Sequence, residues 1–251
     1  MTYKPILAIL VFLLLQALGG ILLGAIGQTS PTAISQTVIL TGLLSVLIIY
    51  LMGLTSGKRL FTARYIQWPL APLALIGTLC GIIATDFVSE LLNLPDLMAD
   101  QFLSMARTPW GICGIAIISP IVEEIVFREA VLGHLLRQGV RPLVAILSSA
   151  LAFGLIHGNP VQIPFATIVG ILFAIIYYKT GSILLTSLLH IINNSIAVAQ
   201  MNILGDQALD FRYTDLLGTG PFLATTLLLS LLSVTLMKRF WDKAPTPTLQ
   251  A

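Results

Sequence analysis

The sequence predicts an all-α, polytopic membrane protein with about eight transmembrane helices, and three observations support this fold class. Hydrophobic residues make up 57% of the 251 residues and charged residues only 10%, whereas an ordinary globular domain contains roughly 25% charged residues. The apolar residues form long stretches, most of which reach the roughly 20 residues that a helix needs to cross a bilayer core. Because backbone polar groups cannot remain unpaired in lipid, such stretches are helices rather than loops. The same composition excludes disordered, collagen-like, coiled-coil and nucleic-acid-binding proteins.

The predicted helices follow the apolar stretches in order. They are residues 5–26, 34–54, 69–92, 110–134, 142–157, 161–178, 182–201 and 218–237. The first is longer than the apolar core of a typical secretory signal peptide and lacks a convincing cleavage site, so we interpret it as a retained helix. The fifth and sixth are short, and the Gly-Asn-Pro sequence at residues 158–160 between them is typical of a turn. No second domain interrupts the series, so we treat residues 1–251 as a single transmembrane domain.

The connection between the third and fourth predicted helices is itself partly apolar. We expect residues 95–109 to lie along the outer membrane interface, with Leu97, Phe102 and Met105 dipping into lipid.

Lysine and arginine residues are distributed unequally between the two sides of the predicted helices. Ten fall in connections on the side of the N-terminus, and only Arg107 and Arg212 fall in connections on the other side. Because cytoplasmic loops of membrane proteins carry the excess of basic residues, we expect an even number of spans with both termini in the cytoplasm. The ten residues are Lys4, Lys58, Arg59, Arg64, Arg137, Arg141, Lys179, Lys238, Arg239 and Lys243.

Polar side chains inside the predicted helices are few and are clustered. The fourth helix carries Glu123, Glu124, Arg128 and Glu129, the fifth carries His157, and the seventh carries His190, Asn193 and Asn194. Ionisable groups at membrane depth are costly and usually face a cavity or a partner. At about 1.5 Å per residue, Glu123, His157 and Asn194 lie roughly 20–24 Å from the inner boundary, and His190 roughly 14 Å. Three helices therefore carry polar groups to a similar level, as a shared site requires.

These residue types are suited to amide hydrolysis without a covalent intermediate. A carboxylate and an imidazole, such as Glu123 and His157, can together hold and deprotonate a water molecule. A second imidazole and an amide, such as His190 and Asn194, can donate hydrogen bonds to a developing oxyanion. These four residues are therefore candidates for catalysis. Ser195 is the nearest candidate nucleophile, but serine in a membrane helix usually serves helix packing.

Three other interpretations stay open. Glu123, His157 and His190 are also acceptable zinc ligands, with water in the fourth position, although the sequence contains no HExxH motif. Intramembrane carboxylates and histidines also form proton relays, so a proton-coupled transporter is an alternative, although we find no internal repeat that would favour it. The third is a polar packing network.

Two pairs of charged residues are expected to be structural. Glu124 and Arg128 are four residues apart on one helix, a spacing that places an acid and a base in contact, so we predict a supporting ion pair. Asp86 and Glu90 lie near the outer end of the third helix, and we expect interfacial or structural roles for them.

Three motifs occur in order, each on its own predicted helix. Glu123-Glu124-Ile-Val-Phe-Arg128 has the pattern EExxxR, Phe153-Gly-Leu-Ile-His157 has FxxxH, and His190-Ile-Ile-Asn-Asn194 has HxxxN. In this order they resemble the CPBP (CAAX protease and bacteriocin-processing, or Abi) family of intramembrane proteases. Residues 179–182, which lead into the third motif, also resemble the family's pattern. The resemblance covers roughly residues 110–200, which we expect to form the catalytic core.

The resemblance implies an eight-helix protease that encloses a conical cavity reached from within the membrane. It implies that Glu123 activates water, that His157 helps to hold the water, and that Glu124 and Arg128 support the site. His190 and Asn194 then correspond to the family's oxyanion-stabilising or metal-binding pair. For the family both a zinc-dependent and a metal-free mechanism have been argued, and the sequence does not choose between them.

The resemblance also implies a substrate class and a location. The enzyme is expected to be similar to type II CAAX prenyl endopeptidases and to cleave a membrane-associated peptide or protein near its C-terminus or its membrane-proximal part. We expect it to lie in a bacterial cytoplasmic membrane. The alternative within the same fold is a non-proteolytic immunity or peptide-binding protein. One departure from the family's pattern is Glu129, which stands where members often have glycine; we expect it to lie near lipid headgroups or to pair with a base.

Overall fold

The computed structural model describes residues 3–55 and 68–245 and is all-helical over these ranges. Seven helices in these ranges are long and apolar enough to cross a membrane, and the fifth predicted stretch forms a shorter apolar helix, α8 (Pro142–Leu155). The all-α membrane fold is therefore confirmed. Lys58, Arg59 and Arg64, which contributed to the predicted orientation, lie outside the described residues. The long helices are α1 (Tyr3–Ala25), α2 (Pro31–Leu51), α3 (Ala71–Leu92), the composite run Pro109–Arg137, α9 (Gln162–Thr180), α10 (Ile183–Leu204) and α12 (Thr219–Lys243).

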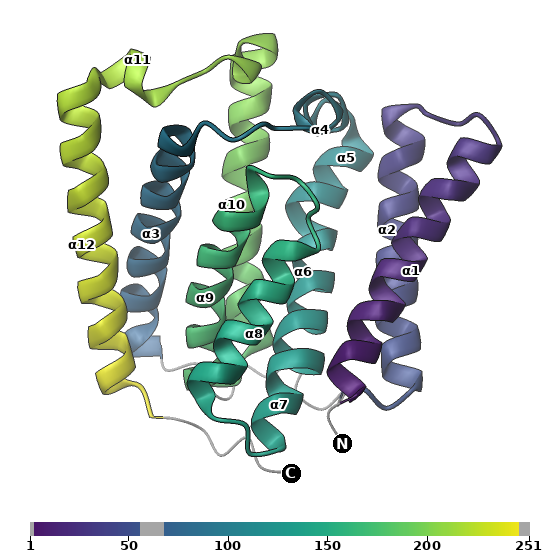
Figure 1. Cartoon of the computed structure of the whole chain (residues 1–251), viewed down its shortest axis with the longest axis horizontal. Coiled ribbons are helices and arrows are strands. Elements are labelled where there is room, and N and C mark those ends of the chain that lie inside the picture. The colour runs from purple at the N-terminus through teal and green to yellow at the C-terminus, as the bar shows by residue number, and fades with distance from the viewer. Residues whose placement is uncertain (1–2, 56–67, 246–251) are drawn as a thin grey trace.

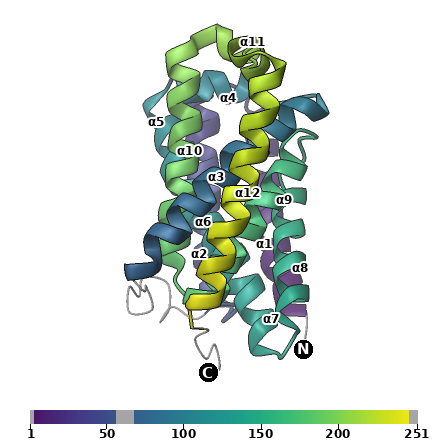
Figure 2. The ribbon, with the colours of Figure 1, turned by 90° about the vertical axis from the view of Figure 1, so that its left-hand side faces the viewer.

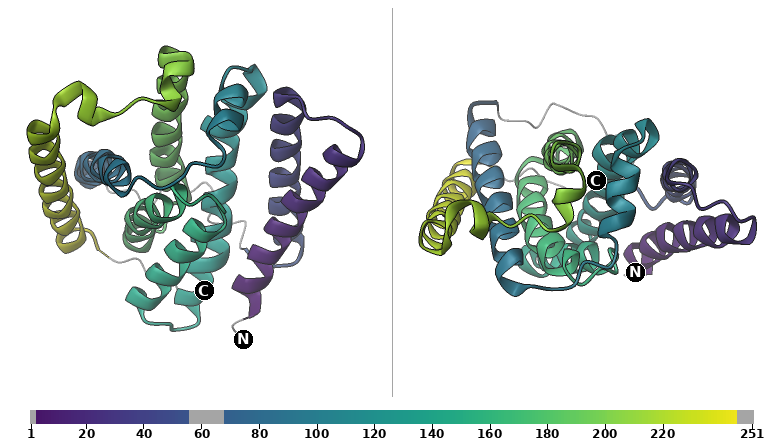
Figure 3. Two further views of the ribbon diagram at one scale, coloured as in Figure 1. Left: turned by 45° about the horizontal axis from the view of Figure 1, so that its top comes forward. Right: turned by 90° about the horizontal axis from the view of Figure 1, so that it is seen from above.

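The helices stand side by side, with the start of α1 and the end of α12 at the same end of the bundle (Figure 1). α1 packs on α2, α8 on α9, and α3 on α12. Seen from above, α10 lies between α3 and the composite run (Figure 3). The short helices α4 (Ala99–Ala106) and α11 (Tyr213–Leu217) lie at the opposite end of the bundle (Figure 2). Below, this end is called the outer end.

Side-chain burial is consistent with a bundle that is solvated by lipid. Large apolar side chains on the outer helices are exposed, among them Leu14, Leu228 and Val234. Inside the bundle, Phe127 packs edge-on against both Phe12 and Phe153, with ring centroids 6.3 and 5.4 Å apart. Such edge-to-face contacts stabilise aromatic clusters beyond the area that they bury. This cluster fixes α1 and α8 against the composite run, which carries the EExxxR motif.

The composite run Pro109–Arg137 has 29 residues and is longer than predicted. It begins as α5 (Pro109–Cys113) and ends as α7 (His134–Arg137). Between them, the π-helical segments η4 (Gly114–Ile118) and η5 (Ile125–Gly133) flank the short α-helix α6 (Ser119–Glu124). Within α-helices, π-helical segments often occur at functional sites. Glu123 and Glu124 are the last residues of α6 and therefore lie between the two π-helical segments.

The connection at residues 95–109 differs in part from the prediction. Leu97 is exposed as expected, but Met105 is buried, and both Phe102 and Met105 line an internal cavity. α4 therefore turns these side chains into the protein rather than into lipid. The fully buried Asn159 holds the start of this connection, because its amide accepts from Leu97 N at 3.0 Å and donates to Asp96 Oδ1 at 2.8 Å.

Candidate active site

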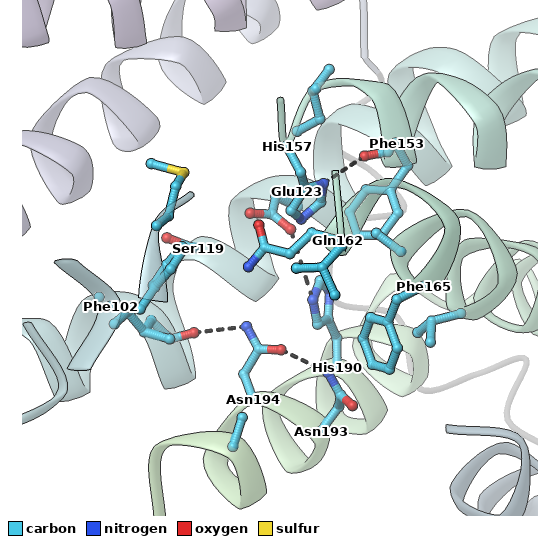
Figure 4. A pocket seen from close by; sticks show the side chains of 18 of the residues that line it. Phe102, Ser119, Glu123, Phe153, His157, Gln162, Phe165, His190, Asn193 and Asn194 are labelled. Carbon is cyan, nitrogen blue, oxygen red and sulfur yellow. Dashed lines mark hydrogen bonds and ion pairs between the residues drawn. The ribbon is translucent and has the colours of Figure 1, made fainter. Parts of the chain in front are cut away.

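A cavity of about 590 Å³ lies within the bundle and brings the predicted catalytic residues together. Most of its lining is apolar, and Glu123, His157, His190 and Asn194 all face it (Figure 4). They come from α6, from the turn after α8, and from α10. Mostly apolar cavities with a few convergent polar groups are typical of binding and active sites. The polar residues that the sequence placed at a similar depth on three helices therefore do meet at one site. Their catalytic roles stay a prediction.

His190 lies between the two glutamates of the EExxxR motif. Its Nδ1 is 3.2 Å from Glu124 Oε1 and its Nε2 is 3.7 Å from Glu123 Oε2. A carboxylate can only accept in such a contact, so Nδ1 carries a proton and donates it to Glu124. The packing of Phe173 against the imidazole, with ring centroids 5.1 Å apart, holds the ring further. Nε2 is consequently the nitrogen that faces Glu123 and the cavity.

The predicted ion pair between Glu124 and Arg128 is present and is fully buried. Arg128 Nε donates to Glu124 Oε2 at 2.9 Å, and both side chains have an exposed fraction of 0%. Arg128 Nη1 donates to Ser149 Oγ at 3.2 Å, and the guanidinium lies 5.0 Å from the centroid of the Phe153 ring. Each oxygen of Glu124 thus has its own partner. Arg128 fixes the carboxylate, and the carboxylate fixes His190.

His157 lies two residues beyond the end of α8, rather than inside the helix as predicted. Its Nδ1 is 2.8 Å from the carbonyl oxygen of Phe153, and the two rings pack edge-on with centroids 5.1 Å apart. A carbonyl accepts only, so the Nδ1 of His157 must carry the proton. In the neutral ring Nε2 is then an acceptor with a free lone pair. The spacing of four residues in the FxxxH motif therefore selects the tautomer.

The π-helical segment η4 positions Asn194. Ser119 N–H bonds to the carbonyl of Gly114, and Pro120 has no N–H, so the carbonyl of Ile115 lacks its usual partners along the helix. Asn194 Nδ2 donates to this carbonyl at 2.9 Å, and Asn194 Oδ1 accepts from Asn193 at 2.8 Å. These two contacts orient the amide, and its second N–H remains for a ligand in the cavity.

The geometry does not fit the three-residue zinc site that the sequence left open. In residues 3–55 and 68–245, no three His, Cys, Asp or Glu side chains converge closely enough to hold a metal ion together. This includes Glu123, His157 and His190.

Three other polar residues from the sequence analysis lie away from the cavity. Glu129 is fully buried and accepts from the Tyr177 hydroxyl and from Arg137 Nη1, the latter at 3.0 Å. Of its two expected environments, pairing with a base is therefore the one observed. Ser195 and Glu90 are also absent from the cavity lining. Asp86, by contrast, lines the cavity. The predicted interfacial or structural role did not include this position in the cavity wall.

Gln162 is a polar residue of the site that the sequence analysis missed. It is the first residue of α9 and lies beside Glu123 in the cavity (Figure 4). α9 approaches α8 closely at Gly154, where a Cβ atom would lie 2.0 Å from Thr167 Oγ1. Glycine is therefore required at this crossing. A polar residue after a Gly-Asn-Pro turn suggests only the start of a helix. The sequence therefore did not indicate that the side chain of Gln162 points into the cavity.

Comparison with known proteins assigns the same region to one family. Residues 105–196 match the family described as type II CAAX prenyl endopeptidase Rce1-like. The chain is 28% identical over 142 residues to the membrane-embedded CAAX protease MroQ of Staphylococcus aureus (strain USA300), covering 53% of this chain and 57% of MroQ. It is 30% identical over 83 residues to the putative membrane peptidase YdiL of Bacillus subtilis (strain 168), covering 33% of this chain and 34% of YdiL. The matches therefore span less than two thirds of either relative. No solved structure matches the chain.

Proposed function

We propose that this chain is an intramembrane endopeptidase, on the premise that it belongs to the family of CAAX-type membrane proteases that its residues 105–196 match. The observation that carries the proposal is the meeting of Glu123, His157 and His190 in one largely apolar cavity. The two histidines are oriented by the carbonyl oxygen of Phe153 and by the buried carboxylate of Glu124. Such indirect positioning is what a preorganised hydrolytic site requires.

In this proposal Glu123 and His157 hold the attacking water. Both present acceptors, so one water can donate a hydrogen to each and direct a lone pair at the carbonyl carbon of the substrate. Glu123 takes the proton as the new C–O bond forms. It then returns the proton to the leaving amine as the C–N bond breaks. No covalent intermediate is needed, which agrees with the position of Ser195 away from the cavity.

His190 and Asn194 complete the site as hydrogen-bond donors to the oxyanion. When both ring nitrogens carry protons, His190 donates Nδ1–H to Glu124 and presents Nε2–H to the cavity. The charges of His190 and Arg128 then balance those of Glu123 and Glu124. Asn194 contributes the N–H that Ile115 does not use. Two preorganised donors of this kind stabilise the charge that develops in the transition state.

The substrate that we propose is a membrane-associated peptide or protein, cleaved near its C-terminus or its membrane-proximal part. A mostly apolar cavity within a lipid-solvated bundle favours a substrate that is already in the membrane. We further propose a bacterial cytoplasmic membrane, with the start of α1 and the end of α12 facing the cytoplasm. Lys238 and Lys243 at the end of α12 agree with the usual excess of basic residues on that side.

Hydrolysis in cells is tested by comparing membrane peptides from cells that produce the native protein with peptides from cells that produce Glu123→Ala. We expect an uncleaved substrate to accumulate with Glu123→Ala and its cleaved fragment to disappear, as measured by mass spectrometry of the membrane fraction. If both strains contain the same peptides while only the native protein confers immunity to a peptide toxin, the protein acts by binding. Uptake of solute by vesicles that contain either protein would instead indicate a transporter.

Replacing Asn194 by alanine tests the oxyanion role. The variant removes one donor and leaves the general base intact, so we expect turnover to fall by about 10²–10³-fold with measurable residual cleavage. Ser195→Ala is the matched control, because Ser195 is the next residue on α10 but does not line the cavity. Equal turnover of the two variants, measured on purified protein, would contradict the role of Asn194.

Removal of metal ions tests the proposed metal-free mechanism. Because no three ligands converge in the described residues, we expect hydrolysis to persist after treatment with a membrane-permeant chelator. The measurement is turnover by purified protein whose metal content is determined in the same sample. Loss of activity that zinc alone restores would show that the side chains rearrange around an ion.

A further inference from the structure

The cavity has a second polar region at the outer end of the bundle. Here Asp86 of α3, Gln200 of α10 and Tyr213 of α11 all line it. The Tyr213 hydroxyl faces Asp86 and also lies 3.4 Å from Gln200 Oε1. Burial and then the nearby Asp86 raise the pKa of Tyr213 to about 12. The hydroxyl therefore stays protonated, and its single hydrogen is shared between these two acceptors.

Asp86 is an acid in the cavity wall that has no cationic partner among the described residues. None of the ion pairs within residues 3–55 and 68–245 includes it. Arg212, which directly precedes α11, donates to Asn93 Oδ1 at 3.1 Å. An intramembrane carboxylate that faces a cavity without such a partner is usually functional.

Glu90 is the structural acid of this region, and it differs from Asp86 in its contacts. Its carboxylate accepts from the backbone of Tyr213 at 2.7 Å and of Thr214 at 3.1 Å, and also from the Thr214 hydroxyl. It does not line the cavity. Glu90 thus ties α11 to α3, which fixes Tyr213 over the cavity, while Asp86 itself lines the cavity.

α10 gives the separation of the two polar regions. His190 and Gln200 lie on this one helix, ten residues apart, which is about 15 Å along the axis at about 1.5 Å per residue. An extended peptide rises about 3.3 Å per residue, so four or five residues span the same distance. Mostly apolar side chains line the space between the regions, including Ile196, Ala197 and Val169.

From this geometry we infer that Asp86, Gln200 and Tyr213 form a subsite that binds a cationic group of the substrate peptide. The group is a lysine or arginine side chain, or an amino terminus, four or five residues from the scissile bond. Asp86 provides the counter-charge, and Gln200 provides a further acceptor for its N–H groups. Apolar residues of the peptide lie between this group and the reacting carbonyl. The inference rests on the proposed peptidase function and assigns part of its specificity.

Peptide binding tests this subsite separately from hydrolysis. Purified Glu123→Gln protein in detergent is titrated with fluorescent apolar peptides that carry lysine, norleucine or glutamate at one position, which is moved along the chain. We expect the lysine peptide to bind at least about tenfold more tightly than the norleucine peptide in one register, as for a desolvated charge pair. Adding Asp86→Asn should abolish this preference and leave binding of the norleucine peptide unchanged.

Two control variants distinguish charge recognition from structural damage. Adding Asp210→Asn removes an exposed acid of the connection between α10 and α11 that does not line the cavity, so the preference for lysine should remain. Adding Asp86→Glu keeps the charge and should also retain it. Equal binding of the lysine and norleucine peptides in every register, or no binding of any of them, overturns the inference. A lysine preference without hydrolysis by protein that retains Glu123 overturns only the proposed function.

Discussion

Glu123→Gln is expected to abolish hydrolysis while the protein remains folded in the membrane. The substitution keeps the size of the side chain but removes its basicity, and loss of a general base costs typically about 10²–10⁴-fold in rate. Glu123 takes no part in the buried pair of Glu124 and Arg128, so its charge is not required for that pair. The measurement is turnover of a cleaved peptide, together with thermal melting of the same purified sample.

The control for this variant is Glu129→Gln in the same run of helix. Glu129 is a buried carboxylate that does not line the cavity, so its loss should lower the melting temperature more than the turnover of the folded fraction. Near-native turnover by Glu123→Gln would show that the catalytic assignment is wrong. The polar cluster would then be structural or a transport path.

Arg128→Ala is expected to have the largest effect on stability. It leaves the fully buried Glu124 without its cationic partner, and breaking a buried ion pair in this way costs about 3–5 kcal/mol. We expect a strongly reduced protein level and a lower melting temperature. Glu124→Gln in the same chain removes the stranded charge and should restore much of the stability.

The double variant also separates support from catalysis. Glutamine at position 124 has one acceptor oxygen, whereas the native carboxylate uses one oxygen for Arg128 and the other for His190. We therefore expect the double variant to be stable but to hold His190 less well, so that turnover stays low. Full recovery of both stability and turnover would contradict a role for Glu124 in orienting His190. An unchanged melting temperature in Arg128→Ala alone would contradict the structural role of the pair.

The sequence predicted the helices and the polar cluster because both depend on local patterns. Apolar length identified the seven long helices and the shorter α8, and a spacing of four residues identified the contacts of Glu124 with Arg128 and of Phe153 with His157. The contact of Glu124 with His190 joins residues 66 positions apart. No local pattern encodes such a contact, so Glu124 was assigned only a supporting role.

The remaining differences arise where tertiary packing decides between equivalent local choices. An apolar residue on a short interfacial helix leaves water with a similar gain in free energy whether it faces lipid or an apolar cavity. In this protein α4 turns Met105 inward. Likewise, an acid near the end of a span can be interfacial or can face a cavity. Packing of α11 on α12 and its hydrogen bonds to Glu90 enclose the region around Asp86, and this arrangement depends on residues more than 120 positions away.

The vacant carbonyl of Ile115 has a consequence for mutational scans of this protein. Pro120 leaves this carbonyl without a helical partner because proline has no backbone N–H. Pro120 does not line the cavity. A scan restricted to the residues around the cavity would therefore omit the position that frees the acceptor for Asn194. Any other residue at position 120 brings an N–H that competes for the same oxygen. The orientation of the Asn194 amide on one helix thus depends on Pro120 on another. An informative scan must therefore include the hydrogen-bond partners of the site residues as well as the residues that line the cavity.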